Sequence, residues 1–251
     1  MSGHSKWSTI KRKKGAADAK RGVIFSKISR EITVAARDGG DDINYNPRLR
    51  TAVMKAKENN MPTNNIERAI KRGTGNLDGV VYEEITHEGY GPGGVAIMIH
   101  CLTDNKNRTT SEIRSQFTKN NGNLGESGCV SYMFDRKGIF ILGSGNYTED
   151  DIMELLIDHG IEDVKIEDEN IVVTTPTDAF NDISDILKEN NYNTILSEIT
   201  FIPKNLTKLD EKKANQCLKL IEGLEDCEDV QNVYSNYDIS DEIMNKISEE
   251  Q

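Results

Sequence analysis

The sequence lacks any apolar run long enough to cross a membrane and any secretory signal. No apolar stretch approaches the roughly 20 residues that span a bilayer. The N-terminal residues MSGHSKW contain no apolar h-region, and glycine stands at position 3 rather than at position 2, where N-myristoylation requires it. We therefore expect a soluble, cytoplasmic protein without a membrane partner. With 36% hydrophobic residues, the 251-residue chain can bury the cores of two or three domains.

Cysteine and histidine are scarce, and neither is arranged as a set of metal ligands. The four cysteines, at positions 101, 129, 217 and 227, include no CxxC pair, and the four histidines show no HExxH spacing. Reduced, partly buried thiols are the simpler interpretation of the cysteines. No nucleophile, base and orienting acid form a recognisable arrangement, and we interpret His87 and Glu88 as surface residues. The sequence predicts no structural metal, no cofactor and no enzymatic activity.

What the sequence has is positive charge concentrated at one end of an acidic chain. The net charge is −11, but residues 1–78 hold 17 Lys and Arg against 8 Asp and Glu. Their net charge is therefore +9, which leaves −20 on residues 79–251. Because the basic charge is confined to one region of an acidic molecule, it indicates a polyanionic partner that this region binds.

Residues 1–78 are predicted to form a basic helical domain behind an N-terminal arm. Gly and Pro separate three segments in which apolar residues recur at helical spacing. The first segment ends at Gly39-Gly40, which are typical of a helix stop. The second begins with Asn46 as N-cap and Pro47 at the first helical position, and the third lies between Pro62 and Gly73.

After Gly79 the pattern changes to strands alternating with amphipathic helices. Residues 81–88 and 95–102 are predicted strands joined by GYGPGG. This loop matches GxGxxG, but a dinucleotide site needs a helix after the motif, whereas here a β-branched run follows, so we predict a turn. A strand is also predicted over residues 129–134. From Gly138 to Ile202 the element order is βαββαβ, which is the ferredoxin-like unit.

These patterns predict an α+β multidomain fold with a helical domain and two α/β domains. The third domain, ferredoxin-like, is inserted into the second. The predicted limits are 1–78 for the helical domain and its arm, 79–134 with 203–238 for the discontinuous second domain, 135–202 for the inserted domain, and 239–251 for an acidic tail.

Two segments are candidates for binding. Residues Trp7 to Lys14 carry four consecutive cations, which neutralise phosphates, beside an aromatic ring that either stacks on a base or packs on the protein. We interpret this arm as a nucleic-acid contact rather than as a solvated tail. Asp104 to Thr110 lies at a strand-to-helix junction. A turn with helix caps is the simpler interpretation there, and a phosphate site at the helix N-terminus is the alternative.

Eight short segments, in order along nearly the whole chain, are specific as a set: Gly3–Trp7, Asp18–Gly22, Asn46–Arg50, Asn59–Pro62, Gly89–Gly94, Asp104–Asn105 with Asn107–Thr109, Asn123–Gly125 and Val230–Tyr234. In these segments the chain resembles the YebC/PmpR family of bacterial proteins and a mitochondrial relative that activates translation of a cytochrome oxidase subunit. The resemblance implies a three-domain protein with the third domain inserted into the second. It also implies a nucleic-acid-binding surface made of His4, Lys6, Trp7, Lys11, Arg12, Lys13, Lys14, Lys20, Arg21, Arg48 and Arg50.

Two functions follow from the resemblance and from the basic domain. The first is a DNA-binding transcriptional regulator, although no helix-turn-helix recognition helix can be identified in the sequence, so phosphate contacts dominate. The alternative is a translation factor that binds ribosomal RNA or mRNA on the ribosome. Both functions need the same cations, so charge does not distinguish DNA from RNA. The resemblance assigns no role to residues 137–203 or to the segment after Asp238.

Overall fold

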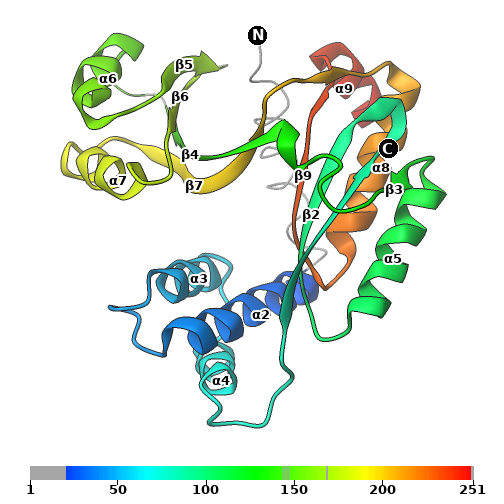
Figure 1. Ribbon diagram of the computed structural model, residues 1–251. Helices are drawn as coiled ribbons and strands as arrows, with labels where there is room; N and C mark the ends of the chain where they lie inside the picture. Colours follow the sequence, from blue (N-terminus) through cyan, green and yellow to red (C-terminus); the bar gives the residue numbers. More distant parts are fainter. Residues whose placement is uncertain (1–20, 144, 146, 168, 250–251) are drawn as a thin grey trace.

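The computed structural model describes residues 21–249 except 144, 146 and 168, and Figure 1 shows three parts. Helices alone form the N-terminal part, and two antiparallel sheets with covering helices form the other two. This confirms the predicted α+β multidomain fold with an inserted third domain. The domain limits at residues 78, 134, 202 and 238 stay predictions.

The N-terminal domain is built around α2 (Arg21–Gly39), against which α3 (Pro47–Glu58) and α4 (Thr63–Gly73) pack (Figure 1). Apolar residues at helical spacing meet in one core, as the sequence predicts. Each of the following core residues is at most 6% exposed: Ile28, Ile32, Ala35, Leu49, Val53, Ala56, Met61, Ile66 and Ala69.

One buried amide sets where α3 begins. Asn46 accepts a hydrogen bond from the backbone N–H of Leu49 at 3.0 Å, which confirms the predicted N-cap. Its side-chain nitrogen donates to the carbonyl oxygens of Ala35 at 2.7 Å and Gly40 at 2.8 Å. The same side chain therefore starts α3 and ties it to the end of α2.

The second domain contains an antiparallel sheet in the order β3-β1-β2-β9. Its strands are β1 (Glu83–Tyr90), β2 (Ala96–Thr103), β3 (Asn123–Leu124) and β9 (Val230–Ser235). Helices α5 (Lys106–Lys119) and α8 (Glu211–Asp226) cover one face of this sheet (Figure 1). The core between them includes Ile97, Ile99, Phe117, Leu220 and Leu224.

The GYGPGG segment joins β1 to β2, as predicted. The strands pair up to Tyr90 and Ala96, and Pro92–Gly94 forms a single turn of 3₁₀-helix (η1). Gly93 and Gly94 have φ values of 78° and 79°, a left-handed conformation that glycine adopts without strain. The glycines therefore serve the turn.

The inserted domain confirms the predicted βαββαβ order. Strands β4 (Phe134–Leu142), β5 (Asp163–Glu167), β6 (Asn170–Thr175) and β7 (Thr194–Pro203) form an antiparallel sheet in the order β5-β6-β4-β7. Helices α6 (Glu149–Leu156), extended by the 3₁₀ turn η3 (Ile157–His159), and α7 (Phe180–Glu189) complete the domain. The long strands β4 and β7 connect it to the second domain (Figure 1).

The strand predicted over residues 129–134 is wrong. Ser131–Met133 forms a 3₁₀ turn (η2), and β4 starts only at Phe134. The cause is Glu88, which we interpreted as a surface residue and which is only 4% exposed. Because this segment folds around the Glu88 carboxylate, its backbone N–H groups are not available to pair with a strand.

The Glu88 carboxylate accepts three backbone hydrogen bonds. The donors are the N–H groups of Gly128 at 2.8 Å, Val130 at 2.7 Å and Ser131 at 2.8 Å. Burial raises the pKa of Glu88, but these backbone hydrogen bonds outweigh burial and hold the pKa below its ordinary value. Glu88 is therefore a charged core residue with all its donors in the second domain.

The segment predicted as an acidic tail, residues 239–251, contains a helix. The two-stranded parallel sheet of β8 (Thr207–Lys208) and β10 (Tyr237–Asp238) leads into α9 (Asp241–Glu249). Ile239 and Ile247 are 2% and 4% exposed, and Ile243 packs against the core of the second domain. Helix α9 therefore packs on the core of the second domain.

Two absences hold for the described part of the chain. None of its helices has both the length and the hydropathy to cross a membrane. None of its groups of His, Cys, Asp and Glu is arranged to hold a metal ion.

Candidate nucleic-acid interface and interdomain junction

Most of the predicted contact residues lie outside the described residues. These are His4, Lys6, Trp7, Lys11, Arg12, Lys13, Lys14 and Lys20, so the arm stays a prediction. Three predicted contacts are described: Arg21, Arg48 and Arg50. Arg21 is exposed at the start of α2.

Arg48 is bound within the protein. Its guanidinium forms ion pairs with Glu31 at 2.7 Å on α2 and with Glu84 at 2.6 Å on β1, and it lies 3.5 Å from Asp38. Burial lowers the pKa of Arg48, but the hydrogen bonds and charges of Glu31 and Glu84 outweigh it and raise the pKa above its ordinary value. Three carboxylates therefore already neutralise this cation, and it joins the helical domain to the second domain.

Arg50 serves the loop between α2 and α3. Its Nε donates to the carbonyl oxygen of Ile43 at 3.1 Å, and its Nη2 donates to that of Asn44 at 2.6 Å. Both bonds hold the loop that precedes the N-cap of α3. The structure therefore brings neither Arg48 nor Arg50 to the surface as an unengaged cation.

Five exposed cations on α3 and α4 are not among the contact residues predicted from the sequence. None of their side chains forms an ion pair or hydrogen bond with another described residue. The signal that finds them is helical periodicity, because they lie off the apolar stripes that pack on α2. They are Lys55 and Lys57 on α3, and Arg68, Lys71 and Arg72 on α4.

The side of α2 that faces away from α3 and α4 contacts the C-terminal end of α8. Lys27 Nζ donates at 2.6 Å to the carbonyl oxygen of Glu225, one of the last carbonyls of α8, which have no helical partner. Arg30 donates to the carbonyl oxygen of Glu228, and its guanidinium lies 5.7 Å from the ring centre of Tyr82. Cations at a helix C-terminus are favoured by the helix dipole. Lys27 therefore caps α8, and Arg30 binds the segment that follows this helix.

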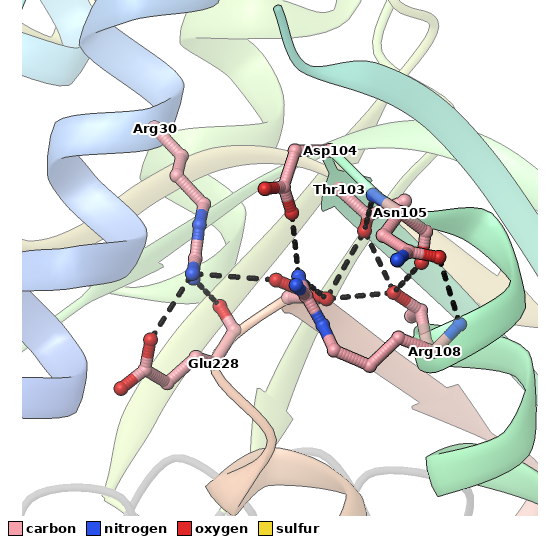
Figure 2. Close-up of polar contacts among 8 residues, drawn as sticks. Arg30, Thr103, Asp104, Asn105, Arg108 and Glu228 are labelled. Atoms are coloured by element: carbon pink, nitrogen blue, oxygen red, sulfur yellow. Dashed lines mark hydrogen bonds and ion pairs between the residues drawn. The ribbon is translucent and has the colours of Figure 1, made fainter. Parts of the chain in front are cut away.

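The centre of this junction is the buried carboxylate of Asp229, whose side chain is 4% exposed. Figure 2 shows Arg30 of α2 and Arg108 of α5 reaching into this junction from two sides. Thr109 donates to it at 2.6 Å and Thr103 at 3.1 Å, while Arg108 lies at 3.0 Å and Arg30 at 3.3 Å. The junction is therefore an ionic network with one buried anion.

The charge state of Asp229 follows from these contacts. Burial raises the pKa of Asp229, but the hydrogen bonds from Thr109 and Arg108 and the charge of Arg30 outweigh it and hold the pKa below its ordinary value. Asp229 is therefore ionised at neutral pH, as a bound partner of two arginines must be.

The junction also decides between the two interpretations of residues 104–110. Asn105 Oδ1 accepts a hydrogen bond from the backbone N–H of Arg108 at 3.1 Å, so Asn105 is the N-cap of α5 (Figure 2). This confirms the turn with caps. Arg108 and Thr109, which would serve a phosphate, bind the carboxylate of Asp229. A carboxylate of the chain itself therefore accepts from Nη2 of Arg108 and Oγ1 of Thr109.

A cavity of about 380 Å³ opens at this junction. Its lining contains two arginines, one tyrosine and five carboxylates, so its net charge repels a polyanion. The lining residues are Arg30, Tyr82, Asp104, Arg108, Glu112, Asp226, Glu228 and Asp229. Nucleic acid is therefore not expected here.

Comparison with known proteins matches both parts of this architecture. A family model described as "TACO1/YebC second and third domain" matches residues 82–237, and one described as "TACO1/YebC protein N-terminal domain" matches residues 5–76. The chain belongs to the TACO1/YebC family. This confirms the family resemblance seen in the sequence. In this structure two residues of the family motifs are bound by carboxylates: Arg48 joins the helical domain to the second domain, and Arg108 pairs with Asp229 inside the second domain.

The TACO1/YebC relatives include proteins that match from end to end. Two proteins named "Probable transcriptional regulatory protein", from Geotalea uraniireducens and Geobacter sulfurreducens, are each 57% identical over 247 residues, which cover 98% of this chain and 100% of theirs. A solved structure of a conserved hypothetical protein from Aquifex aeolicus matches with a TM-score of 0.79 and 45% identity, over 91% of this chain and 94% of that one.

Proposed function

We propose that this protein is a nucleic-acid-binding regulator of gene expression that contacts its partner through the helical domain and the arm before it. The names of the relatives support a role in regulation. DNA is the proposed partner, because those names refer to transcription. Neither a catalytic step nor a cofactor is part of this proposal.

The observation that carries the proposal is how the cations of the helical domain are used. Residues 21–78 contain 11 Lys and Arg. Five of them bind groups of the described chain: Lys27, Arg30, Arg37, Arg48 and Arg50. The other six, Arg21 and the five on α3 and α4, have no such side-chain partner among the described residues. Unengaged cations on one domain are what a phosphate backbone binds.

The rest of the molecule supports the same placement. Residues 79–251 carry a net charge of −20, and the cavity at the junction is lined mainly by carboxylates. Like charges repel a polyanion over about one Debye length, roughly 8 Å at physiological salt. The two α/β domains therefore confine the contact to the helical end.

One observation favours RNA as a second candidate partner. Tyr45 is 85% exposed, in the loop that Arg50 and Asn46 hold in place. An exposed ring on a rigid loop can stack on an unpaired base, and unpaired bases are the usual targets of sequence-specific RNA recognition. The acidic residues Asp41 and Asp42 precede Tyr45 and oppose a phosphate backbone there. We therefore keep DNA as the first proposal.

The experiment that tests the proposal measures salt dependence. Full-length protein is titrated against a mixed-sequence DNA duplex and a structured RNA between about 50 and 200 mM salt, where affinities for phosphate change steeply. Alanine at Lys11, Arg12, Lys13 and Lys14 is expected to weaken binding and to flatten the plot of log K against log salt by about one unit per lost contact. An unchanged slope would show that the arm makes no contact.

A matched variant removes the same charge elsewhere. Lys188, Lys208, Lys212 and Lys219 are exposed on the α/β domains, and alanine at these four positions is expected to leave the slope unchanged. In cells, crosslinking of the protein to promoter DNA supports the DNA proposal. Migration with ribosomes in sucrose gradients, without promoter enrichment, would instead support the translation factor.

A further inference from the structure

We propose that α4 is a recognition helix that enters the major groove of duplex DNA. Its outward face carries Asn64 and Arg68 toward the bases, and Lys71 and Arg72 toward the phosphates. This inference rests on the proposed function and specifies which element reads the partner. It supplies the recognition helix that could not be identified in the sequence.

The turn between α3 and α4 has the length and rigidity of a helix-turn-helix. Helix α3 ends at Glu58 and α4 begins at Thr63, so four residues separate them. Asn60 has a φ of 55°, its N–H donates to the carbonyl of Lys57, and the N–H of Met61 donates to that of Ala56, both at 2.9 Å. These two bonds are those of a Schellman motif, which fixes the direction of the chain after a helix.

Helix α4 is held against α2 along its inner face. Ile66 and Ala69 are buried there, and Thr33 Oγ1 of α2 donates to the carbonyl oxygen of Ala69 at 3.2 Å. At the end of α4, a Cβ on Gly73 would collide with the carbonyl oxygen of Thr33, so the two backbones are in close contact. The position of α4 is therefore set by its packing.

The outer face of α4 is polar and exposed, and its side chains have no ion pair or hydrogen bond with another described residue. Asn64, Glu67, Arg68 and Lys71 recur at the spacing of one helical face, and all four are exposed. Arg72 adds a cation beside them, so the helix carries three cations and one carboxylate. Figure 1 shows α4 at the outer edge of the molecule, on the side of α2 away from the inserted domain. A large partner can therefore approach this face.

The dimensions and the chemistry favour duplex DNA over duplex RNA. The major groove of B-form DNA is about 12 Å wide and admits an α-helix, whereas the major groove of A-form RNA is too narrow for side chains to read. An amide such as that of Asn64 can pair with adenine, and a guanidinium such as that of Arg68 can pair with guanine, through two hydrogen bonds each. Lys71 and Arg72 extend the same surface toward phosphates.

The first test distinguishes phosphate contacts made by α4 from a general effect of the protein's net charge. A triple variant with alanine at Arg68, Lys71 and Arg72 is expected to bind a mixed-sequence DNA duplex at least about tenfold more weakly near physiological salt. Its control removes the same charge from the second domain, with alanine at the exposed residues Lys208, Lys212 and Lys219, and is expected to change affinity less than about twofold. Thermal unfolding confirms that both variants are folded.

The second test measures whether α4 contacts base edges in the major groove. Full-length protein selects duplexes from a randomised DNA library, and the selected duplex is compared with a scrambled one. The double variant Asn64→Ala with Arg68→Ala is expected to lose about 5- to 150-fold of the preference for the selected duplex. It is also expected to lose the protection of guanine N7 from dimethyl sulfate, which reports the major groove. The control combines Asn181→Ala with Arg114→Ala, both exposed on the α/β domains.

The outcomes distinguish this inference from the proposed function. If the arm variant loses affinity while the α4 variants keep affinity, preference and N7 protection, α4 is not the recognition helix and the proposed function stands. If the wild-type protein binds no nucleic acid, both fail. Tighter binding to structured RNA than to any selected DNA duplex, with loss in the α4 triple variant, would overturn the assignment of α4 to the DNA major groove.

Discussion

Arginines on two sides of the helical domain are used in opposite ways. Arg30 and Arg48 face the second domain, where they bind Asp229 and Glu84. Arg68 and Arg72 face outward on α4 and have no ion pair with another described residue. The residue type and the domain are the same, so the difference lies in what surrounds each side chain. Folding therefore uses part of the basic charge of this domain to fix it on the α/β domains.

This comparison separates stability from binding. Substitutions around Asp229 on the inner side are expected to change the free energy of unfolding, because that carboxylate is buried. Substitutions on the outer side are expected to change affinity for nucleic acid and to leave stability nearly unchanged. Each prediction below tests whether the two sides are as distinct as the structure indicates.

The largest effect is expected for Asp229→Ala. The substitution leaves Arg30, Arg108, Thr103 and Thr109 without their shared acceptor, and breaking a buried ionic network from one side costs about 3–5 kcal/mol. Urea denaturation followed by circular dichroism measures this loss. Asp185→Ala removes an exposed aspartate and is expected to cost less than about 0.5 kcal/mol. A loss below about 1 kcal/mol for Asp229→Ala would show that the junction contributes little to stability.

Glu88→Ala is expected to cause the next largest loss of unfolding free energy. It leaves three backbone N–H groups, one buried and two partly buried, without an acceptor, at a cost of about 3 kcal/mol in the free energy of unfolding. Glu88→Gln is also expected to destabilise, because both carboxylate oxygens accept bonds and an amide nitrogen at either place would face a donor. Unlike Asp229, Glu88 draws these donors only from the second domain. Hydrogen exchange of α2 should therefore stay unchanged in folded Glu88→Gln protein.

Much of the fold was predictable because its signals are local. Asn46 caps α3, as the sequence predicts. Thr148 and Asp151, which are three positions apart, form a capping box at the start of α6. The βαββαβ order of the inserted domain also follows from local periodicity. These features depend on residues a few positions apart, and the sequence displays them directly.

The errors concern contacts between distant residues. Glu88 lies 43 positions from Ser131, Arg108 lies 121 from Asp229, and Arg30 lies 198 from Glu228. No periodicity relates such positions, so Glu88 was interpreted as a surface residue. For the same reason the sequence does not show that Arg48, which stays a predicted nucleic-acid contact, is bound to three carboxylates. The sequence predicts which domain carries the proposed nucleic-acid interface. Packing determines which cations of that domain form ion pairs with other described residues.

Acid is expected to weaken the contacts of Asp229 on the inner side of the helical domain. The folded-state pKa of Asp229 lies below its ordinary value, so its ionisation stabilises the fold above the unfolded-state pKa of about 3.9. That contribution is lost as the pH falls below about 4 toward the folded-state pKa. The difference in unfolding free energy between wild type and Asp229→Asn should be constant from neutral pH to about 5 and should shrink in stronger acid. Urea midpoints at each pH measure it, and a constant difference throughout would contradict the assignment.

The smallest effect on stability is expected for Arg48→Ala, and it tests the comparison most directly. Arg48 is 40% exposed, and ion pairs at such positions contribute about 0–1 kcal/mol. Because Glu31, Asp38 and Glu84 neutralise Arg48, its loss should leave the affinity for a DNA duplex at physiological salt unchanged.

Arg68→Ala removes an arginine side chain from the outer face and should weaken DNA binding several-fold. It should also lower the slope of log K against log salt by about one unit. Titrations of both variants against one duplex measure the contrast. Equal losses of affinity would mean that the total charge of the helical domain, and not the engagement of each cation, determines binding.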